Sequence, residues 1–277
     1  MTAFKCGRFS LDLSQTKIMG VLNCTPDSFS DGGRFLTLDA ALAQAEKLLR
    51  DGADILDLGA ESTRPGAAEV PAEEEIRRLR PLVQALRRWS VPLSIDTKKT
   101  AVMAALLDEG ADMINDVRAL EDEGALDLVK RFDCGLCLMH MRGQPATMQA
   151  NTDYDDLIGE VRDYLGRRVG AAEAVGIDRA RLCLDFGFGF GKTPAQNMAL
   201  IRHSADFLAL GLPLLVGVSR KSTIGHYLGG APVEERLIGS VTLAALSAWL
   251  GAGIVRVHDV AETRQALAMV AALKSAH

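Results

Sequence analysis

The 277-residue sequence has few aromatic residues and no excess of positive charge. Aromatic residues make up 5% of the chain, and the formal net charge is −5 at pH 7. Domains that bind nucleic acids usually have a basic footprint, so this balance argues against a nucleic-acid partner. Any anion that the chain binds must meet a local cluster of basic side chains. Hydrophobic residues make up 48% of the chain, which is enough to bury the core of a soluble globular protein.

Targeting and membrane-spanning segments are also lacking. The first ten residues contain no apolar core of the kind that a secretory signal requires. Residues 237–255 have no charge over a length that could cross a membrane, but Gly239, Ser240 and the Gly251-Ala-Gly253 break interrupt them. A buried helix that leads into a buried strand is the better interpretation. We therefore expect a cytoplasmic protein with no membrane partner.

Cysteine is sparse and indicates neither a disulfide framework nor a metal site. The five cysteines are an odd number, and without an export signal they are predicted to be reduced thiols. Cys134 and Cys137 have the spacing of a redox pair, but no helix begins between them, so we interpret them as small apolar residues that open a strand. No Cys and His residues have the spacing of a structural zinc site.

Strand-like and helical patterns alternate along the whole chain after a short hairpin at residues 4–13. Strands are predicted at 17–23, 54–58, 92–95, 111–114, 135–139, 181–184, 213–218 and 253–257. Helices are predicted at 39–50, 73–89, 100–109, 124–132, 153–175, 195–210, 234–250 and 261–273. The strands are nearly continuous apolar runs, which is typical of a parallel sheet that is covered on both faces.

Eight such units in a chain of this length predict an α/β fold, a single (β/α)8 TIM barrel with a short N-terminal β-hairpin. A doubly wound open sheet also alternates strands and helices and remains an alternative. No segment rich in Pro, Gly or Ser divides the chain. We therefore expect one domain, residues 1–277, with the hairpin at 1–15 and the barrel at 16–277.

A polar side chain lies at or just after the end of every predicted strand. These residues are Asn23, Arg64, Asp96, Asn115, His140, Asp185, Lys221 and His258, with Arg256 inside the last strand. Helix N-caps explain single Asp or Asn residues at such places, but they do not explain the whole ring. Active sites of TIM barrels lie at the carboxyl ends of the strands, so we expect these side chains to converge at one mouth.

The basic side chains of this ring belong to neighbouring strands of a closed barrel. Arg64, Arg256 and His258 are anion receptors, and Asn23 lies on the strand between them. A neutral oxygen such as that of Asn23 suits a Mg²⁺ ion that keeps most of its waters and bridges phosphate oxygens. The alternatives are a loop salt bridge for Arg64 and a core histidine for His258.

The other side chains of the ring match the edge of a planar heterocycle. Asp96 and Asp185 are carboxylates, which accept two parallel N–H bonds from an amidine-like group. Asn115 both donates and accepts, and Lys221 donates to a carbonyl. Together these groups fit a 2-amino-4-oxo-pyrimidine edge. For Asp96 and Lys221, a buried ion pair is the alternative.

The loop after the sixth predicted strand, Asp185-Phe-Gly-Phe-Gly-Phe-Gly-Lys192, combines a carboxylate with three glycines and three aromatic rings. Glycine permits positive φ and a close approach of the backbone to a ligand. The rings of Phe186, Phe188 and Phe190 are predicted to offer aromatic faces. The loop only weakly resembles a dinucleotide fingerprint or, at Gly191-Lys192-Thr193, the end of a P-loop, because the spacing of glycines fails in both.

With these motifs in this order, the chain resembles the bacterial dihydropteroate synthases, from about residue 16 to residue 270. The motifs are Met19-Gly-Val-Leu-Asn-Cys-Thr-Pro-Asp-Ser-Phe-Ser-Asp-Gly-Gly33, Gly59-Ala-Glu-Ser-Thr-Arg-Pro-Gly66, Ser94-Ile-Asp-Thr97, Ile114-Asn-Asp116, Leu138-Met-His-Met141, Leu184-Asp-Phe-Gly-Phe-Gly-Phe-Gly-Lys192, Val218-Ser-Arg-Lys-Ser222 and Arg256-Val-His-Asp259. The resemblance implies a transferase that condenses 6-hydroxymethyl-7,8-dihydropterin pyrophosphate with p-aminobenzoate and releases pyrophosphate. It also implies Mg²⁺ as cofactor, a homodimer, and competition by sulfonamides for the p-aminobenzoate pocket.

The resemblance further implies roles for individual residues. The pterin would be held by Asp96, Asn115, Met139, Asp185, Phe190, Gly217 and Lys221. Pyrophosphate would be held by Asn23, Thr63, Arg64, Arg256 and His258, with Asn23 as the metal ligand. The p-aminobenzoate pocket would be bordered by Phe29, Thr63, Pro65, Phe188, Phe190, Lys221 and Ser222. The catalytic residues would be Asp96, Lys221, Arg256 and His258.

Two residues depart from the family pattern, and two other functions remain open. Cys24 stands where a small aliphatic residue is common, and Phe186 stands where proline is common. A corrinoid-linked methyltransferase that binds methyltetrahydrofolate shares the barrel and the pterin carboxylates, but it has no use for a pyrophosphate cluster. A pterin-binding paralogue that has lost its chemistry would be expected to lack Lys221 or Asn23.

Overall fold

The computed structural model describes residues 3–24, 38–61, 69–143, 148 and 151–276. Eight parallel strands form its central sheet: β3 (Lys17–Asn23), β4 (Ile55–Gly59), β5 (Leu93–Asp96), β6 (Met113–Asp116), β7 (Gly135–Met139), β8 (Leu182–Asp185), β9 (Leu215–Val216) and β10 (Ile254–Val257). Their order is β8-β7-β6-β5-β4-β3-β10-β9. A parallel bridge between Leu184 and Leu214 joins the two outermost strands, so the sheet closes on itself. The predicted TIM barrel is confirmed, and the open sheet is wrong.

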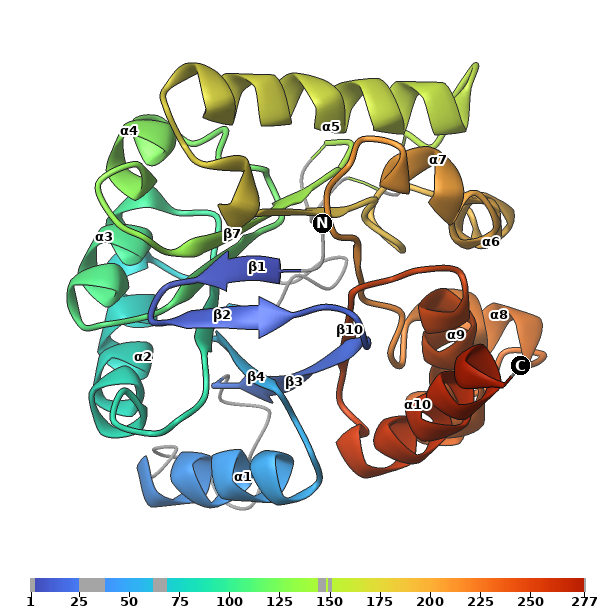
Figure 1. The fold of residues 1–277 in the computed structure, drawn as a ribbon, viewed down its shortest axis with the longest axis horizontal. Coiled ribbons are helices and arrows are strands. Elements are labelled where there is room, and N and C mark those ends of the chain that lie inside the picture. The colour runs from blue at the N-terminus through green and yellow to red at the C-terminus, as the bar shows by residue number, and fades with distance from the viewer. Residues whose placement is uncertain (1–2, 25–37, 62–68, 144–147, 149–150, 277) are drawn as a thin grey trace.

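Helices surround these strands (Figure 1). They are α1 (Leu38–Arg50), α2 (Ala72–Leu86), α3 (Thr100–Asp108), α4 (Ala125–Val129), α5 (Leu157–Ala174), α6 (Pro194–Arg202), α7 (Ser204–Leu208), α8 (Ser222–Tyr227), α9 (Leu237–Trp249) and α10 (Val260–Ser275). Two short 3-10 turns, Arg179–Arg181 and Val233–Arg236, precede β8 and α9. The outer core lies between the strands and this layer of helices.

The structure corrects the predicted elements in three places. The helix expected at 195–210 divides into α6 and α7, because His203 leaves the helical conformation with φ −96° and ψ 25°. The strand expected at 213–218 shortens to β9. Helix α8 was not predicted, since six residues are too few to show a helical period.

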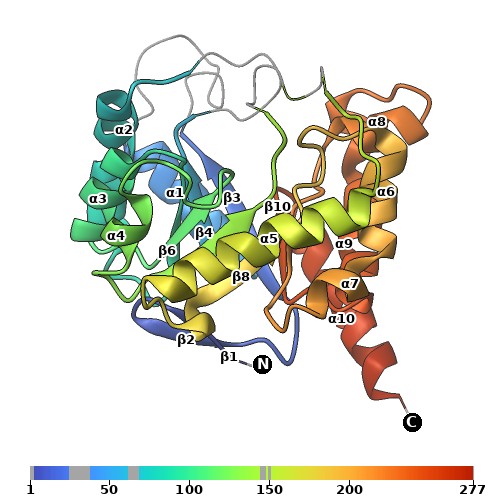
Figure 2. The ribbon, with the colours of Figure 1, turned by 90° about the horizontal axis from the view of Figure 1, so that it is seen from above.

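The N-terminal hairpin closes the amino end of the barrel. Strands β1 (Ala3–Cys6) and β2 (Phe9–Asp12) pair antiparallel, as predicted for this segment. Phe4 and Cys6 are fully buried against the interior residues at the start of the barrel strands. Figure 2 shows the hairpin at one end of the molecule and α8, which follows β9, near the other. The opposite, carboxyl end is therefore the one that can hold a site.

The charge-free segment at 237–255 forms α9 and β10. Within the described residues, no helix is long and apolar enough to cross a membrane. The strand is buried as predicted, but one face of α9 is exposed, with Ile238 at 75% of its possible exposure. The prediction of a wholly buried helix was wrong on this point.

Candidate active site

The barrel interior consists of two layers, because every second residue of a strand points inward. The layer at the amino end is apolar and includes Ile55, Met113, Cys183 and Ile254. Two residues further along the same four strands lie Asp57, Asn115, Asp185 and Arg256. Three residues of the ring predicted from the sequence, Asn115, Asp185 and Arg256, thus occupy the second inward position of their strands.

Arg256 lies at the centre of the polar layer. Its Nε donates to Asp57 Oδ2 at 2.6 Å, and its Nη2 donates to Asp96 Oδ2 at 2.8 Å. The Nδ2 of Asn115 donates to the same Asp57 oxygen at 3.3 Å. These bonds link β4, β5, β6 and β10. Burial opposes the charge of Arg256, but the carboxylates of Asp57 and Asp96 raise its pKa above the ordinary value.

These contacts change the arrangement expected from the sequence. Arg256 was placed with the anion receptors, apart from the pterin group, yet its guanidinium bonds directly to Asp96. The ion-pair partner of Asp96 is therefore Arg256. Sequence reasoning also missed Asp57, which is fully buried. The signal was present, because an aspartate in the middle of an apolar strand must point toward a polar partner.

The carboxyl groups of Asp96 and Asp185 hold their protons more tightly than exposed ones. Burial raises the pKa of Asp96 to about 7, although Arg256 acts in the opposite direction. Burial also raises the pKa of Asp185, while Lys221 and the N–H of Gly187 oppose it. Asp185 Oδ1 accepts that N–H at 2.7 Å. Arg256 also favours the Asp185 carboxylate, which places the two groups in one electrostatic unit at the same end of the barrel.

Lys221 reaches the same space from the residues after β9. Its Nζ donates to the carbonyl oxygen of Phe188 and lies 4.6 Å from the centroid of the Phe190 ring. A Cβ added to Gly217 would lie 3.9 Å from this nitrogen and 3.7 Å from Arg256 Cβ. Burial lowers the pKa of Lys221 to about 8, although Asp185 opposes the shift. Gly217, Lys221 and Arg256 therefore border one space, although the sequence assigned Gly217 and Lys221 to the pterin and Arg256 to pyrophosphate.

Lys221 Nζ lies over two of the three aromatic rings of the Gly/Phe loop, at 5.8 Å from the Phe188 centroid and 4.6 Å from that of Phe190. Phe186 and Phe188 are 0% exposed and belong to the outer core. Phe190 instead packs with Met139 and Val117 in a separate small cluster. The prediction of open aromatic faces was wrong for Phe186 and Phe188, because both rings are fully buried and Phe186 packs against Phe207. The Phe188 ring is buried but lies near Lys221 Nζ, and its place at the p-aminobenzoate pocket stays a prediction.

Asn23 and His258 occupy the β3 and β10 side of the mouth. A Cβ added to Gly59 would lie 3.7 Å from both Asn23 Oδ1 and Asp96 Oδ2, so these oxygens border one space. The backbone N–H of His258 donates to Ser219 Oγ at 3.2 Å, and its Nδ1 lies 3.0 Å from that oxygen. The remaining site predictions, Phe29, Thr63, Arg64 and Pro65, lie outside the described residues. Ser222 begins α8, directly after Lys221.

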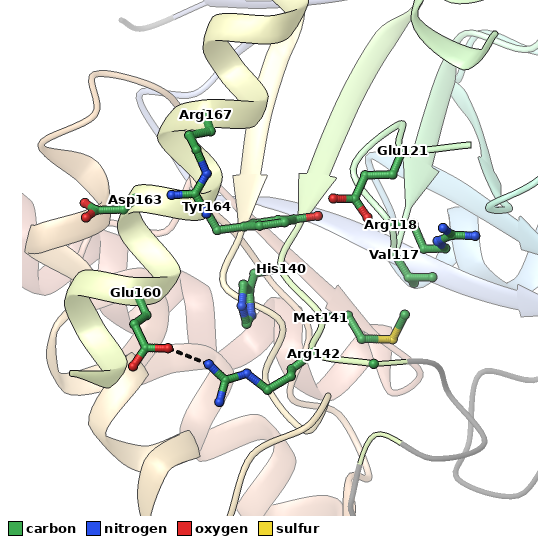
Figure 3. Close-up of a pocket in the computed structure, with 11 residues that line it drawn as sticks. Val117, Arg118, Glu121, His140, Met141, Arg142, Glu160, Asp163, Tyr164 and Arg167 are labelled. Carbon is green, nitrogen blue, oxygen red and sulfur yellow. Dashed lines mark hydrogen bonds and ion pairs between the residues drawn. The ribbon is translucent and has the colours of Figure 1, made fainter. Parts of the chain in front are cut away.

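A cavity of about 610 Å³ lies beside the mouth, between α5 and the residues that follow β6 and β7. Figure 3 shows the Arg142–Glu160 ion pair at one side of it and His140 between Tyr164 and Arg142. None of the residues that bond to Arg256 lines this cavity. Its lining includes Val117, which also packs against Phe190, so the cavity adjoins the site without being part of it.

The cysteines behave as the sequence predicts. All five are unpaired and buried. Cys134 and Cys137 open β7, and no helix begins between them. Burial raises the pKa of the Cys24 thiol to about 12. No cysteine thiolate is therefore available as a nucleophile at the mouth near neutral pH.

Comparisons with known proteins agree with this geometry. Residues 19–258 match the family described as "Pterin binding enzyme". The chain is 52% identical over 276 residues to the dihydropteroate synthase of Neisseria meningitidis serogroup B, covering 98% of this chain and 97% of that protein. The Xanthomonas albilineans enzyme solved with 4-aminobenzoic acid has a TM-score of 0.94 and 45% identity, covering 100% and 99% of the two chains. The Burkholderia cenocepacia enzyme complexed with 7,8-dihydropteroate has a TM-score of 0.91 and 44% identity, covering 99% and 97%.

Proposed function

We propose roles for the site residues on the basis of the family to which the chain belongs. The chain is a member of the pterin-binding enzyme family and, within it, of the dihydropteroate synthases. It is a transferase that forms 7,8-dihydropteroate from p-aminobenzoate and 6-hydroxymethyl-7,8-dihydropterin pyrophosphate. The observation that best supports the assignment of roles is the guanidinium of Arg256 between Asp57 and Asp96, next to Asp185 and Lys221. This arrangement supplies the ring-recognising and anion-binding groups in one place.

Asp185, Asn115 and Lys221 are proposed to bind the pterin ring. The Asp185 carboxylate would accept the paired N–H groups of the 2-amino edge, which is a strong charge-assisted contact. Asn115 would donate and accept beside it, and the Lys221 ammonium would donate to the ring carbonyl. Met139 and Phe190 pack together next to this region and provide an apolar wall for the ring.

The chemistry proposed for the site begins with loss of pyrophosphate. The C–O bond at the pterin methylene breaks, the electron pair leaves with the pyrophosphate oxygen, and a resonance-stabilised cation remains. The aniline nitrogen of p-aminobenzoate then forms the new C–N bond and releases its proton. Because the aniline is a weak base, it needs positioning more than deprotonation before it attacks.

The residues of the mouth are proposed to stabilise the charges that develop in this reaction. Arg256 and His258, with Arg64 outside the described residues, would neutralise the leaving pyrophosphate. The Nε and Nη2 of Arg256 already bond to carboxylates, so we assign Nη1 to the incoming phosphate oxygen. An anionic Asp96 would attract the pterin cation by Coulomb interaction.

Mg²⁺ is compatible with the donors at this mouth. Within the described residues, no group of three His, Cys, Asp or Glu side chains could hold a metal ion. Mg²⁺ does not need such a group, because it commonly keeps several waters and binds substrate phosphates with one or two protein oxygens. We propose Asn23 Oδ1 as that oxygen. When bound, the ion would neutralise charge on the pyrophosphate.

A coupled assay tests the proposed function. Formation of 7,8-dihydropteroate should require both p-aminobenzoate and the dihydropterin pyrophosphate, and EDTA should abolish it together with pyrophosphate release. Restoration by added Mg²⁺ would assign the metal. Release in the absence of p-aminobenzoate would support the stepwise cation. No release under any condition would contradict the assignment, and so would methyl transfer from methyltetrahydrofolate to a corrinoid.

We also propose a homodimer through the exposed apolar face of α9 and α10. These helices pack against each other, and each leaves large apolar side chains in solvent. Ile238 is 75% exposed and Met269 is 67% exposed. Contiguous apolar surface of this kind is typical of subunit interfaces. Light scattering of the wild type should give twice the mass of one chain. The Ile238→Asp/Met269→Asp double variant should give the mass of a single chain.

The unpaired cysteines support a proposed cytoplasmic location, because thiols stay reduced there.

A further inference from the structure

Lys192 is a buried lysine at the carboxyl end of the barrel to which the reaction proposed above assigns no role. Its residue exposure is 2%. The Nζ donates to the carbonyl oxygens of Gly187 at 3.0 Å and of Phe190 at 2.9 Å, and it lies 3.0 Å from His140 Nδ1. In sequence, this lysine belongs to the Gly191-Lys192-Thr193 run that resembles the end of a P-loop. In the structure its ammonium instead bonds to the loop that precedes it.

The backbone of this loop needs such partners. Gly187, Gly189 and Gly191 have φ values of 71°, 85° and 65°, a conformation that side chains rarely adopt. A Cβ at Gly187 would lie 1.8 Å from the carbonyl oxygen of His140, so the loop packs closely against the end of β7. Alternating conformations of this kind direct peptide groups into the protein instead of into a helix or strand. A buried peptide group without a partner destabilises the folded state.

The opposite side of the same loop forms part of the candidate site. The carbonyl oxygen of Phe188 accepts from Lys221 Nζ, and the Phe190 ring lies 4.6 Å from that nitrogen. Lys192 therefore holds the carbonyls of residues 187 and 190, while Lys221 bonds to the carbonyl between them. Any displacement of the loop would move the Phe190 ring and the Lys221 ammonium together.

We propose that Lys192 is a positioning residue for the p-aminobenzoate site: its ammonium fixes the carbonyls of Gly187 and Phe190, and thereby the places of the Phe190 ring and of Lys221. The proposal rests on the proposed function, because it needs Phe190 and Lys221 to border that substrate. Lys192 itself touches no substrate in this scheme. It acts only through the loop.

A charged ammonium has three N–H donors, which match the three nearest acceptors of Lys192; the carbonyl oxygen of His140 lies further away, at 3.5 Å from Nζ. This match requires His140 to be neutral with its proton on Nε2. Burial, Lys192 and Arg142 all lower the pKa of His140, which favours the neutral ring. A neutral amine has two N–H groups for the same three acceptors, so deprotonation of Lys192 removes one of the bonds that hold the loop.

The charges around Lys192 determine the pH at which its ammonium loses a proton. Burial lowers the pKa of Lys192 to about 7, while Asp185 opposes the shift. Lys221 and Arg142 lower it further, and His140 contacts it as a neutral ring. The support of the loop should therefore weaken as the pH rises through about 7. The KM for p-aminobenzoate should rise over the same range.

Lys192→Met tests the proposal against a matched variant, Arg181→Met. Arg181 is also buried, and it also donates to two backbone carbonyls, those of Cys134 and Val129, but it lies at the amino end of β8. We expect Lys192→Met to raise the KM for p-aminobenzoate at least tenfold, with kcat at saturation within threefold. Arg181→Met should lower the melting temperature by a similar amount and leave this KM within twofold.

Two further variants keep the test decisive if Lys192→Met does not fold. His140→Phe removes one acceptor and leaves both carbonyl bonds, so it should raise the KM for p-aminobenzoate about threefold. Lys192→Arg keeps the charge at every pH. It should therefore flatten the rise of this KM between pH 6 and 9. Lys221 titrates in both proteins, so the difference between the two profiles isolates position 192.

The outcomes separate this proposal from the proposed function. A wild-type protein without synthase activity would defeat the proposed function and leave the Lys192 variants without meaning. An active wild type with an unchanged KM for p-aminobenzoate in Lys192→Met and His140→Phe would overturn the positioning role alone. So would a KM that rises equally in Arg181→Met, because that result would show only a loss of stability.

Discussion

The two layers of the barrel interior are built on the same strands, two residues apart, and they differ in almost every physical property. The amino-end layer is dry: Met113 and its neighbours are fully buried beneath the ring of Phe4. The carboxyl-end layer contains Asp57, Asn115 and Arg256 in one hydrogen-bonded group. One layer closes the barrel, and the other forms the candidate site.

This difference shows that charged groups are buried at the carboxyl end of the barrel, where they lower stability and serve the reaction. Burial of apolar side chains stabilises the amino-end layer by about 25 cal/mol per Å² of apolar surface removed from water. At the carboxyl end of the barrel, burial raises the pKa of Asp96 and lowers the pKa of Lys221. Asp57 Oδ1 and Ser94 Oγ are buried without a hydrogen-bond partner among the described residues. Substitutions in the two layers should therefore affect stability and activity separately.

Arg256→Met should have the largest effect on activity. The variant would leave Asp57 and Asp96 buried without their cation, and removing one partner of a buried pair costs about 3–5 kcal/mol. We expect kcat/KM to fall more than about 10³-fold, because the group that neutralises the leaving pyrophosphate is lost. The coupled assay and urea denaturation measure the two effects.

Arg8→Met is the matched change at the amino end. Arg8 donates to the buried Asp112 through Nε at 2.9 Å and through Nη2 at 2.8 Å. The variant should also lose stability, but its kcat/KM should stay within about twofold, because no ligand-binding group lies near it. Equal losses of activity in both variants would break the distinction between the layers.

Asp96→Asn should have the next largest effect, with a kcat about 10²-fold lower and a KM for the dihydropterin pyrophosphate within about threefold. The anionic carboxylate is proposed to act on the cation, and its pKa of about 7 means that wild-type kcat should fall as the pH drops below 7. This acid limb should be absent from the variant. Equal losses in kcat and in pterin affinity would count against the role.

The raised pKa of Asp96 also predicts how the stability of the protein depends on pH. The folded pKa of Asp96 lies above its ordinary value of 3.8, so the native state keeps this proton longer than the unfolded chain. The stabilisation is complete below that ordinary value and is lost as the pH rises through about 7. Denaturation of Asp96→Asn from pH 4 to pH 7 should show a smaller decline in stability than the wild type.

Met113→Ala and Asn115→Ala, two residues apart on β6, should give opposite patterns. Met113→Ala leaves a cavity in the apolar layer at the amino end of the barrel. It should lower the free energy of unfolding by about 2–5 kcal/mol, with kcat and KM close to the wild type. Asn115→Ala should cost about 1–2 kcal/mol, because one bond to Asp57 is lost. It should also raise the KM for the dihydropterin pyrophosphate about tenfold. The pair sharpens the comparison, since a loss of activity in Met113→Ala would show that the layers are coupled.

Cys24→Ala should have the smallest effect. Cys24 follows Asn23 but belongs to the outer core, so it tests whether the inward face of a strand or merely its carboxyl end determines function. We expect kcat/KM within about twofold. Burial raises the pKa of its thiol to about 12, so the wild type should resist iodoacetamide at pH 8. Rapid alkylation with loss of activity, followed by mass spectrometry, would contradict this.

Most of the fold could be predicted from the order of apolar runs, because each strand and helix is encoded by residues that are neighbours in sequence. The exceptions are local: His203 divides a helix that its flanking residues would continue, and α8 is too short to show a period. At the site, Asp185 and Lys221 could be predicted as charges next to strand ends. The burial of Phe186 could not, because it depends on packing against Phe207, which lies 21 residues further along the chain.

The sequence by itself determined eight strand and helix units, an apolar amino-end layer, and a polar residue near every strand end. Only the tertiary structure decided which of these charges meet. Arg256 bonds to residues 199 and 160 positions away, and it reaches them because closure of the sheet places β10 beside β3. It likewise decided that Lys192 faces the loop carbonyls of Gly187 and Phe190. Pairing of buried charges depends on distances that closure alone sets, whereas strand and helix propensity depends on neighbours along the chain.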